Sequence, residues 1–262
     1  MSFSTFLDPC SNQGVGLAFT DRLGGVSMPP YDSLNLGRTD VDDPWNVATN
    51  FRIVSDLIGV DRIAICSQVH GTHVERVDDS YSIPIGEGSF PDQGDHTRVA
   101  DALVTMEFDV ALAIRVADCV PVLLADPDAG VVAAAHAGRV GLLAGILQNT
   151  LIAMRDMGAK KIQAWIGPHI CPSCYEVPPA MADLAWAQIP ATKATSRDGT
   201  PALDLGAGAQ AILESESVLV TNCDPCTSCD PHFFSHRRDK GQTGRQAGLI
   251  WLSHSRTRTS SG

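Results

Sequence analysis

Short apolar runs bounded by polar or glycine-rich stretches recur along the chain and predict β-strands. The predicted strands cover residues 15–20, 62–67, 110–116, 120–125, 131–135, 162–166 and 218–221. Helical periodicity alternates with them and is clearest over residues 140–157, where apolar residues recur at spacings of three and four. Gly158 follows at the position where a helix C-terminus favours a left-handed residue.

Shorter helices are predicted at residues 44–59, 179–188 and 204–216. Strands and helices intermix, and neither an internal repeat nor a low-complexity linker interrupts them, so the pattern predicts a single mixed α/β domain. Residues 78–98 and 192–200 are polar and rich in turn-forming residues, which indicates surface loops. We expect one catalytic domain over residues 1–253 and a disordered tail at residues 254–262.

The charge balance limits the classes of partner. The chain has 30 acidic and 19 basic residues and a net charge of -11, which argues against binding to nucleic acid or to an anionic membrane. The charge reverses from Ser235 onward, where Asp239 is the one acidic residue. The basic residues there are Arg237, Arg238, Lys240, Arg245, Arg256 and Arg258. This local reversal would suit an anionic ligand.

No apolar run reaches the roughly 18 to 20 residues of a membrane-spanning helix, and the first residues do not resemble a secretory leader. We therefore expect a cytoplasmic protein. Thiols stay reduced in that compartment, so the eight cysteines are interpreted as packing residues, metal ligands or nucleophiles rather than as a disulfide framework.

Potential metal ligands follow three of the predicted strands. His70 lies in "SQVHGTH", Cys119 in "ADCVP" and His136 in "AAAHAG". Loops at strand ends are where catalytic groups gather. Two imidazoles and one thiolate suit Zn²⁺ with a fourth position open to water, and the same set with a weak axial sulfur resembles a copper site.

Packing offers a different interpretation of the same residues. Cys119 fits the pattern of a small buried hydrophobe, and His136 that of a strand-end histidine with a satisfied hydrogen bond. His73 competes with His70 as a ligand, but it is expected to begin the next strand and to be structural.

Two further motifs have the spacing of zinc ligands. Cys171 and Cys174 form "CPSC", while "CDPCTSC" contains Cys223, Cys226 and Cys229. Two paired C-x-x-C units, such as Cys171, Cys174, Cys226 and Cys229, would build a structural four-cysteine site.

Eight segments together carry a resemblance to a known family. They are "PYDSLNLG" (30–37), "DDPWNVATN" (42–50), "QVHGTHV" (68–74), "ADALVT" (100–105), "ADCVPVLLADP" (117–127), "AAHAG" (134–138), "IGPHICPSCYEV" (166–177) and "FFSHRRDKGQTGRQAGLIWL" (233–252). In content and order they resemble the YfiH family, formerly labelled laccase-like polyphenol oxidases and now described as purine nucleoside phosphorylases.

The resemblance implies an α+β fold, a single layered domain of mixed β-sheets with flanking helices. It also implies a zinc ion whose ligands match His70, Cys119 and His136, with copper as the alternative metal. It does not by itself imply a metal at the four-cysteine motifs. The implied activities are phosphorolysis of adenosine, inosine, guanosine and methylthioadenosine, with adenosine deamination beside them. Asp118 would then be a neighbour of the metal that either supports its ligands or handles a proton.

The chain departs from the family pattern in one place. The family reads His-Ala-Gly-Trp-Arg-Gly-Leu, whereas this chain has Arg139 and Val140 at the Trp-Arg positions. The cation is therefore displaced by one residue, about 100° around a helix. We expect altered geometry and weak phosphate affinity.

The expected roles follow from the chemistry of phosphorolysis. Purine departure needs a proton donor, for which Asp101, Asp118 or a histidine would serve, and Cys119 joins the catalytic set. Phosphate would bind at the helix N-terminus after His136. The substrate-binding candidates are Arg139, Arg237, Arg245 and Asn35. Deamination would need an activated water and an acid/base carboxylate.

Alternatives from other classes remain open. A cysteine hydrolase would use Cys119 as nucleophile and His136 as base, in peptidoglycan-precursor editing. A copper-binding oxidoreductase is less well supported, since multicopper oxidases use several His-x-His pairs and this chain has none. A metal-binding module without catalysis is a third possibility. For the leading interpretation the partners are purine nucleosides and phosphate, with no nucleic acid and no membrane.

Overall fold

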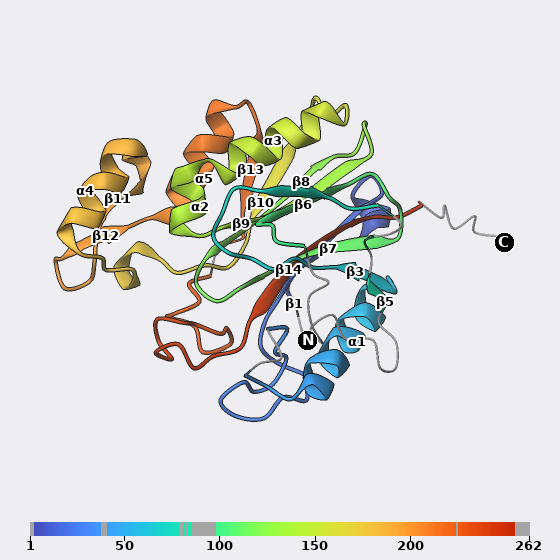
Figure 1. Cartoon of the computed structure of the whole chain (residues 1–262), viewed down its shortest axis with the longest axis horizontal. Helices are drawn as coiled ribbons and strands as arrows, with labels where there is room; N and C mark the ends of the chain where they lie inside the picture. The colour runs from blue at the N-terminus through green and yellow to red at the C-terminus, as the bar shows by residue number, and fades with distance from the viewer. Residues whose placement is uncertain are drawn as a thin grey trace.

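Two β-sheets packed face to face form the centre of the protein, and helices cover both outer faces (Figure 1). The computed structural model describes residues 3–37, 41–78, 81, 83–84, 98–223 and 225–254. The layers run helix, sheet, sheet, helices (Figure 1). This arrangement confirms the expected α+β fold of mixed sheets with flanking helices.

The first sheet has six strands, and its outer face is covered by α1 (Pro44–Ile58). Its spatial order is β1 (Phe3–Leu7), β2 (Val15–Thr20), β14 (Gln246–Leu252), β7 (Val110–Val116), β3 (Arg62–Ala64) and β5 (Ile83–Pro84). Only the pair β3–β7 is parallel. The Asp43 side chain accepts a hydrogen bond from Trp45 N and caps α1, and Gly59 ends it in the left-handed conformation.

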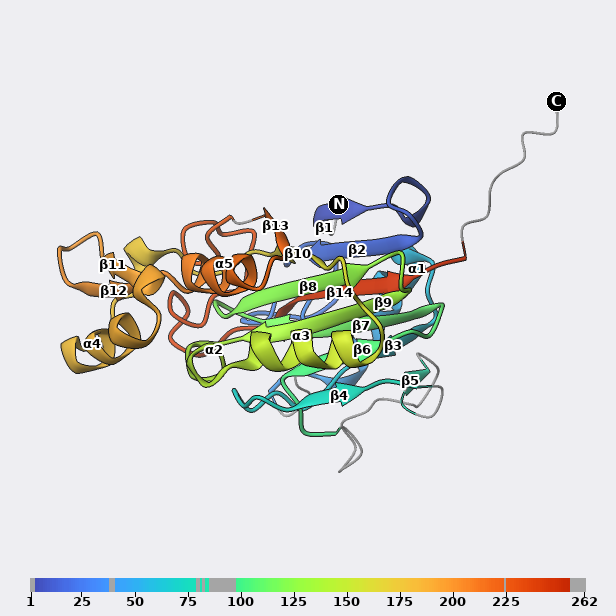
Figure 2. The same ribbon diagram turned by 90° about the horizontal axis from the view of Figure 1, so that it is seen from above.

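The second sheet also has six strands and carries most of the helices. Its order is β13 (Leu219–Asn222), β10 (Gln163–Ile166), β8 (Val120–Asp126), β9 (Val131–Ala137), β6 (Ala102–Thr105) and β4 (Val74–Arg76). Its outer face packs against α2 (Arg139–Ala144), α3 (Ile146–Asp156) and α5 (Leu205–Ser215). At one end lie α4 (Pro179–Gln188) and the hairpin of β11 (Lys193–Thr195) and β12 (Pro201–Leu203) (Figure 2). Single 3₁₀ turns occur at η1 (Pro9–Ser11), η2 (Pro172–Cys174) and η3 (Pro190–Thr192).

The central strands are buried on both faces, which explains their continuous apolar sequences. In β9, Val131, Ala133 and Ala135 pack against the helices. Val132 and Ala134 face the first sheet. Because side chains alternate along a strand, His136 belongs to this second row and lies at its end, between the sheets.

The structure corrects several predicted elements. The helix predicted over residues 140–157 is two helices, because Gly145 adopts a left-handed φ of 98° between α2 and α3. Residues 192–200 are not simply a surface loop, since Thr192 is buried and residues 193–195 form β11. The strand prediction missed β14, although every residue of it is buried.

Two predicted segments lie largely outside the described residues: most of residues 78–98, and residues 255–262 of the predicted tail. In the part of the chain that the structure describes, no helix is long and apolar enough to cross a membrane.

Candidate metal centre and adjoining cavity

The fold brings together three side chains from separate strand ends. His70 lies in the loop after β3, Cys119 in the turn between β7 and β8, and His136 near the end of β9. One potential ligand atom from each lies within 4.8 Å of the others. Cys119 Sγ is 3.6 Å from His70 Nε2, and the two imidazole centroids are 4.7 Å apart. These three residues could hold a metal ion.

The backbone around these side chains leaves room for them. A Cβ atom at Gly138 would lie 2.5 Å from His70 Cδ2 and 3.1 Å from Cys119 Sγ, so a side chain there would displace both. His136 is buried, Cys119 is half-buried and His70 is exposed. The set of two imidazoles and one thiol therefore fits a zinc-like metal with one side left accessible.

Asp101 holds two of the three candidate ligands in position. Its Oδ1 atom accepts hydrogen bonds from His136 Nδ1 (2.8 Å) and from the His70 amide (2.9 Å), and its Oδ2 atom accepts one from the Gly71 amide (2.6 Å). Burial raises the pKa of this carboxyl, but the hydrogen bonds from His136 and Gly71 outweigh burial and bring the pKa below its usual value. The ionised carboxylate orients His136 so that Nε2 is left for a metal.

The electrostatics of the cluster favour a thiolate. Burial raises the pKa of Cys119, but the contacts with His136 and His70 prevail and lower it to about 6. Burial lowers the pKa of His136, but hydrogen bonds with Asp101 and Cys119 prevail and raise it to about 9. Since the thiolate is the form that binds metals and attacks electrophiles, Cys119 is prepared for either role.

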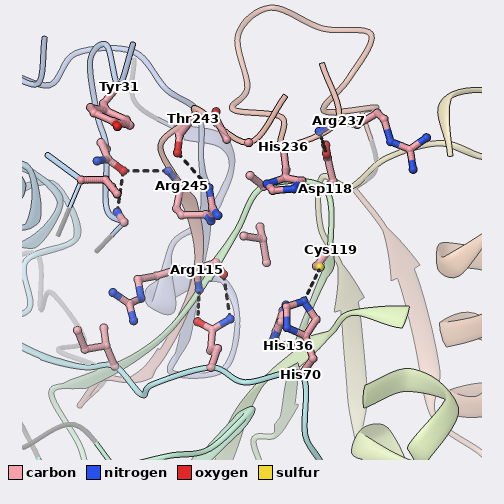
Figure 3. A pocket seen from close by; sticks show the side chains of 18 of the residues that line it. Tyr31, His70, Arg115, Asp118, Cys119, His136, His236, Arg237, Thr243 and Arg245 are labelled. Carbon is pink, nitrogen blue, oxygen red and sulfur yellow. Dashed lines mark hydrogen bonds between the residues drawn. The ribbon is translucent and has the colours of Figure 1, made fainter. Parts of the chain in front are cut away.

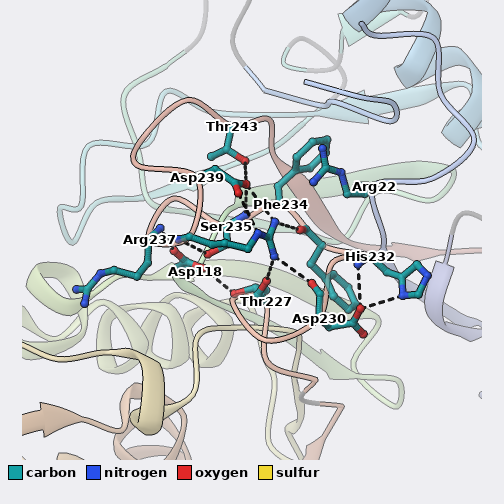
Figure 4. A network of polar contacts seen from close by, with 12 residues as sticks. Arg22, Asp118, Thr227, Asp230, His232, Phe234, Ser235, Arg237, Asp239 and Thr243 are labelled. Atoms are coloured by element: carbon teal, nitrogen blue, oxygen red, sulfur yellow. Dashed lines mark hydrogen bonds and ion pairs between the residues drawn. The ribbon is translucent and has the colours of Figure 1, made fainter. Parts of the chain in front are cut away.

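Asp118, next to Cys119, ties two segments of the chain together. Its Oδ1 atom accepts a hydrogen bond from Thr227 Oγ1 (2.7 Å), and its Oδ2 atom accepts one from the Arg237 amide (2.6 Å) (Figure 4). Asp118 is buried and adopts a left-handed φ of 87°, which is unusual for a residue with a side chain. The carboxylate thus fastens the segment around residues 227–237 to the turn that carries Cys119.

A cavity of about 550 Å³ adjoins the candidate ligands. Figure 3 shows Cys119, His70 and His136 on one wall, with Arg115 and Arg245 across from them. Further lining residues are Tyr31, Asn35, Tyr175, His236 and Thr243. The cavity is thus bounded by strand ends of both sheets, by the loop before α1 and by the segment before β14.

Two of the predicted substrate-binding residues line this cavity as a connected pair. Arg245 projects into it and donates hydrogen bonds through Nη1 to the carbonyls of Thr243 (3.1 Å) and Gly244 (2.9 Å) (Figure 3). Burial lowers the pKa of Arg245, while the charges of Cys119 and Asp118 oppose that effect. Asn35 is fully buried, and its Oδ1 atom accepts a hydrogen bond from the Arg245 amide (2.9 Å).

Arg237 also lines the cavity, but its guanidinium is held at one side of it. The Arg237 guanidinium points away from Cys119 and Arg245, stacks over Tyr175 at 5.2 Å and donates to the Glu176 carbonyl (3.0 Å) (Figure 3). Arg139, the first residue of α2, is not among the described residues that line the cavity, and its positive charge opposes the burial that raises the pKa of Tyr175.

Three further residues line the cavity that the sequence pattern did not indicate as site residues: Arg115, Tyr31 and His236. The Arg115 side chain donates to the Cys66 carbonyl (2.9 Å), and the Gln68 side chain bonds both the amide and the carbonyl of Arg115 (2.9 Å each). Arg115 could have been found from the sequence, because it is the charged residue inside the apolar strand "VALAIRV". His73 is exposed beside Glu75 and lies outside the cluster.

Known proteins match this chain over nearly its whole length. Residues 16–253 match the family model described as multi-copper polyphenol oxidoreductase laccase. A purine nucleoside phosphorylase of Streptomyces coelicolor is 47% identical over 244 residues (91% of this chain and 96% of that protein), and one of Corynebacterium glutamicum is 43% identical over 251 residues (94% and 97%). The crystal structure of the Bacillus licheniformis hypothetical protein YfiH superimposes with a TM-score of 0.82 at 32% identity, over 92% of this chain and 94% of that one. With its sequence and its fold both matched over nearly their whole length, this chain belongs to the YfiH family.

Proposed function

We propose that this chain is a zinc-dependent purine nucleoside phosphorylase. The observation that carries the proposal is the open His70–Cys119–His136 cluster on the wall of a cavity that also contains Arg115 and Arg245. Close relatives named purine nucleoside phosphorylase support it. The substrates we assign are adenosine, inosine, guanosine and methylthioadenosine, with adenosine deamination as a side activity.

The protein side chains divide the remaining tasks. Zinc held by the cluster would supply Lewis-acid chemistry next to the bound substrate. The cavity volume of about 550 Å³ lies in the range of small-molecule sites and suits a nucleoside with phosphate. We assign phosphate binding to Arg245 and Arg115, because guanidinium groups form strong charge-assisted hydrogen bonds with phosphate oxygens. Arg237 stacks over the Tyr175 ring instead, and the charge of Arg139 acts on the pKa of the Tyr175 hydroxyl.

Purine departure requires a proton at the leaving nitrogen. Asp101 is unsuited to supply it, because its pKa lies below the usual value and it has no exposed surface. Asp118 uses both oxygens to hold Thr227 and Arg237. We therefore assign proton delivery to His236, an exposed imidazole on the cavity wall, and treat Asp101 and Asp118 as positioning residues.

Product analysis tests the assignment. Zinc-loaded protein incubated with adenosine or inosine should form free base and ribose 1-phosphate only when phosphate is present. The same assay compares His70→Ala, which removes a candidate ligand, with His73→Ala as its matched control. His73 lies three residues away and outside the cluster. If the only product is inosine, formed from adenosine without phosphate, then deamination is the only one of the two proposed activities that the protein has. Unchanged nucleosides under both conditions, from a sample verified to contain zinc, would refute the proposal.

One observation favours a second candidate, a cysteine hydrolase. Cys119, His136 and Asp101 form a chain of contacts like that of a catalytic triad, and the pKa of Cys119 is lowered to about 6. Its activity would require the metal-free thiolate and would be lost on alkylation. Activity that disappears when zinc is removed, and returns when zinc is restored, would exclude it. Metal analysis of the same samples distinguishes zinc from copper, the metal named by the family description.

A further inference from the structure

A second cluster of thiols lies outside the cavity. Cys171 directly precedes η2, Cys174 is its last residue, and Cys226 and Cys229 lie in the segment after β13. The four Sγ atoms all lie within 4.8 Å of one another, although 55 residues separate Cys174 from Cys229 along the chain. Neither the proposed catalysis nor the metal site implied by the family resemblance uses these residues.

The spacing of the sulfur atoms fits a shared metal ion. With Zn–S bonds of about 2.3 Å, the sulfurs of a tetrahedral site lie ~3.8 Å apart. The Cys174 and Cys229 Sγ atoms are 3.4 Å apart, well beyond the ~2.05 Å of a disulfide bond. All four cysteines are free thiols. Four sulfurs would complete the coordination of zinc and leave no open position.

The surroundings are suited to metal-bound thiolates. The Cys171 amide donates a hydrogen bond to Cys226 Sγ (3.2 Å). The Arg197 guanidinium lies 4.0 Å from Cys229 Sγ. Four thiolates around Zn²⁺ carry a net negative charge, and both the amide and the guanidinium reduce its cost.

The two cysteine motifs contain five cysteines, and the fold brings four of them together. Cys223 precedes Cys226 with the same C-x-x-C spacing, yet it packs against the core between the two sheets. Only the pairs 171/174 and 226/229 converge. We propose that Cys171, Cys174, Cys226 and Cys229 bind a structural zinc ion, distinct from a metal at His70, Cys119 and His136.

This zinc ion would fasten together two segments that form the cavity wall. Tyr175, which directly follows Cys174, lines the cavity. Thr227, which directly follows Cys226, donates its amide to the His169 carbonyl (3.0 Å) and its hydroxyl to Asp118. The zinc thus stabilises the segment to which the Cys119 turn is anchored. The metal site does not depend on the proposed function.

The test removes the first cluster and examines the zinc that stays. A His70→Ala/His136→Ala variant of the full chain, purified under reducing conditions without chelator, should contain one zinc per chain. X-ray absorption at the zinc edge should detect four sulfur neighbours at about 2.3 Å. Adding Cys229→Ser, at the most exposed of the four ligands, should remove this zinc, whereas adding Cys223→Ser should leave it.

Three results would overturn the inference: a double variant without zinc, zinc with nitrogen or oxygen neighbours, or a Cys174–Cys229 disulfide found by mass spectrometry after alkylation. The absorption measurement needs no cysteine substitution, so poor folding of Cys229→Ser would not obscure it. If wild-type protein contains a single zinc that survives in the double variant, the first cluster lacks metal and the four-cysteine site stands. If that zinc is lost from the double variant, the four-cysteine site fails.

Discussion

The two side-chain clusters of this protein differ in ligand number and surroundings. His70, Cys119 and His136 come from three strand ends and open onto a cavity with arginines opposite. Cys171, Cys174, Cys226 and Cys229 come from two loops and offer a complete set of thiols.

The difference indicates separate tasks for the two clusters. A three-ligand site keeps a position for substrate, whereas a four-ligand site holds segments together. The supporting contacts differ in the same sense. Asp101 orients the His136 imidazole and holds the His70 backbone in the open cluster, while an amide and Arg197 face the sulfurs of the closed one. Substitutions in the first should mainly change catalysis, and substitutions in the second should mainly change stability.

The largest effect is expected from His136→Ala. Lewis-acid assistance contributes several kcal/mol, and each 1.4 kcal/mol is tenfold in rate, so we expect turnover to fall about a thousandfold or more. Phosphorolysis assays with metal analysis would measure this. The variant should keep the zinc of the four cysteines, and His73→Ala should behave as wild type. A His136→Ala protein with more than a tenth of wild-type turnover would remove the distinction between the clusters.

Asp101→Asn should weaken zinc binding at the open cluster by about 10- to 100-fold, because His136 would lose the carboxylate that orients it. Competition with a chromophoric chelator would measure the affinity. Asp126→Asn is a matched control, since Asp126 is also buried and accepts the amides of Lys160 and Lys161 away from both clusters. Equal zinc affinity in the two variants would assign Asp101 a purely structural part.

Arg245→Gln should raise the KM for phosphate about tenfold while changing the KM for nucleoside less, because a charge-assisted hydrogen bond contributes roughly 1.5 to 3 kcal/mol. Initial rates at varied phosphate would measure it. Arg237→Gln should change the phosphate KM less, since that guanidinium is bound to the Glu176 carbonyl and stacked on Tyr175. The opposite ranking would transfer phosphate binding to Arg237.

The smallest effect on turnover at room temperature is expected from Cys229→Ser. Loss of a cross-link between two segments should cost a few kcal/mol, and each kcal/mol lowers Tm by about 2–4 °C in a protein of this size, so we expect a drop of roughly 10 °C. Thermal unfolding would measure it, with Cys223→Ser as control. A variant with unchanged Tm and strongly reduced turnover would reverse the roles of the clusters.

The sequence predicted the elements whose signals are local. Helix α1 has Asp43 and Gly59 at its ends, and α5 begins after Asp204, whose side chain accepts a hydrogen bond from the Ala207 amide. Predictions from the sequence failed where contacts between distant residues decide the position of an element. Gly145 divides a continuous helical periodicity into α2 and α3, and β14 has a strand sequence whose central position follows only from its pairing with β2 and β7.

The sequence by itself determined the family, several of the core strands, and the residue types at His70, Cys119, His136 and the C-x-x-C pairs. Only the tertiary structure decided which of these residues meet. It placed Cys119 beside His70, 49 residues away, and turned the Arg245 guanidinium into the cavity and the Arg237 guanidinium away from Cys119 and Arg245. The physical reason is that periodicity and capping act over a few residues, whereas sheet pairing and side-chain packing join positions that local pattern cannot relate.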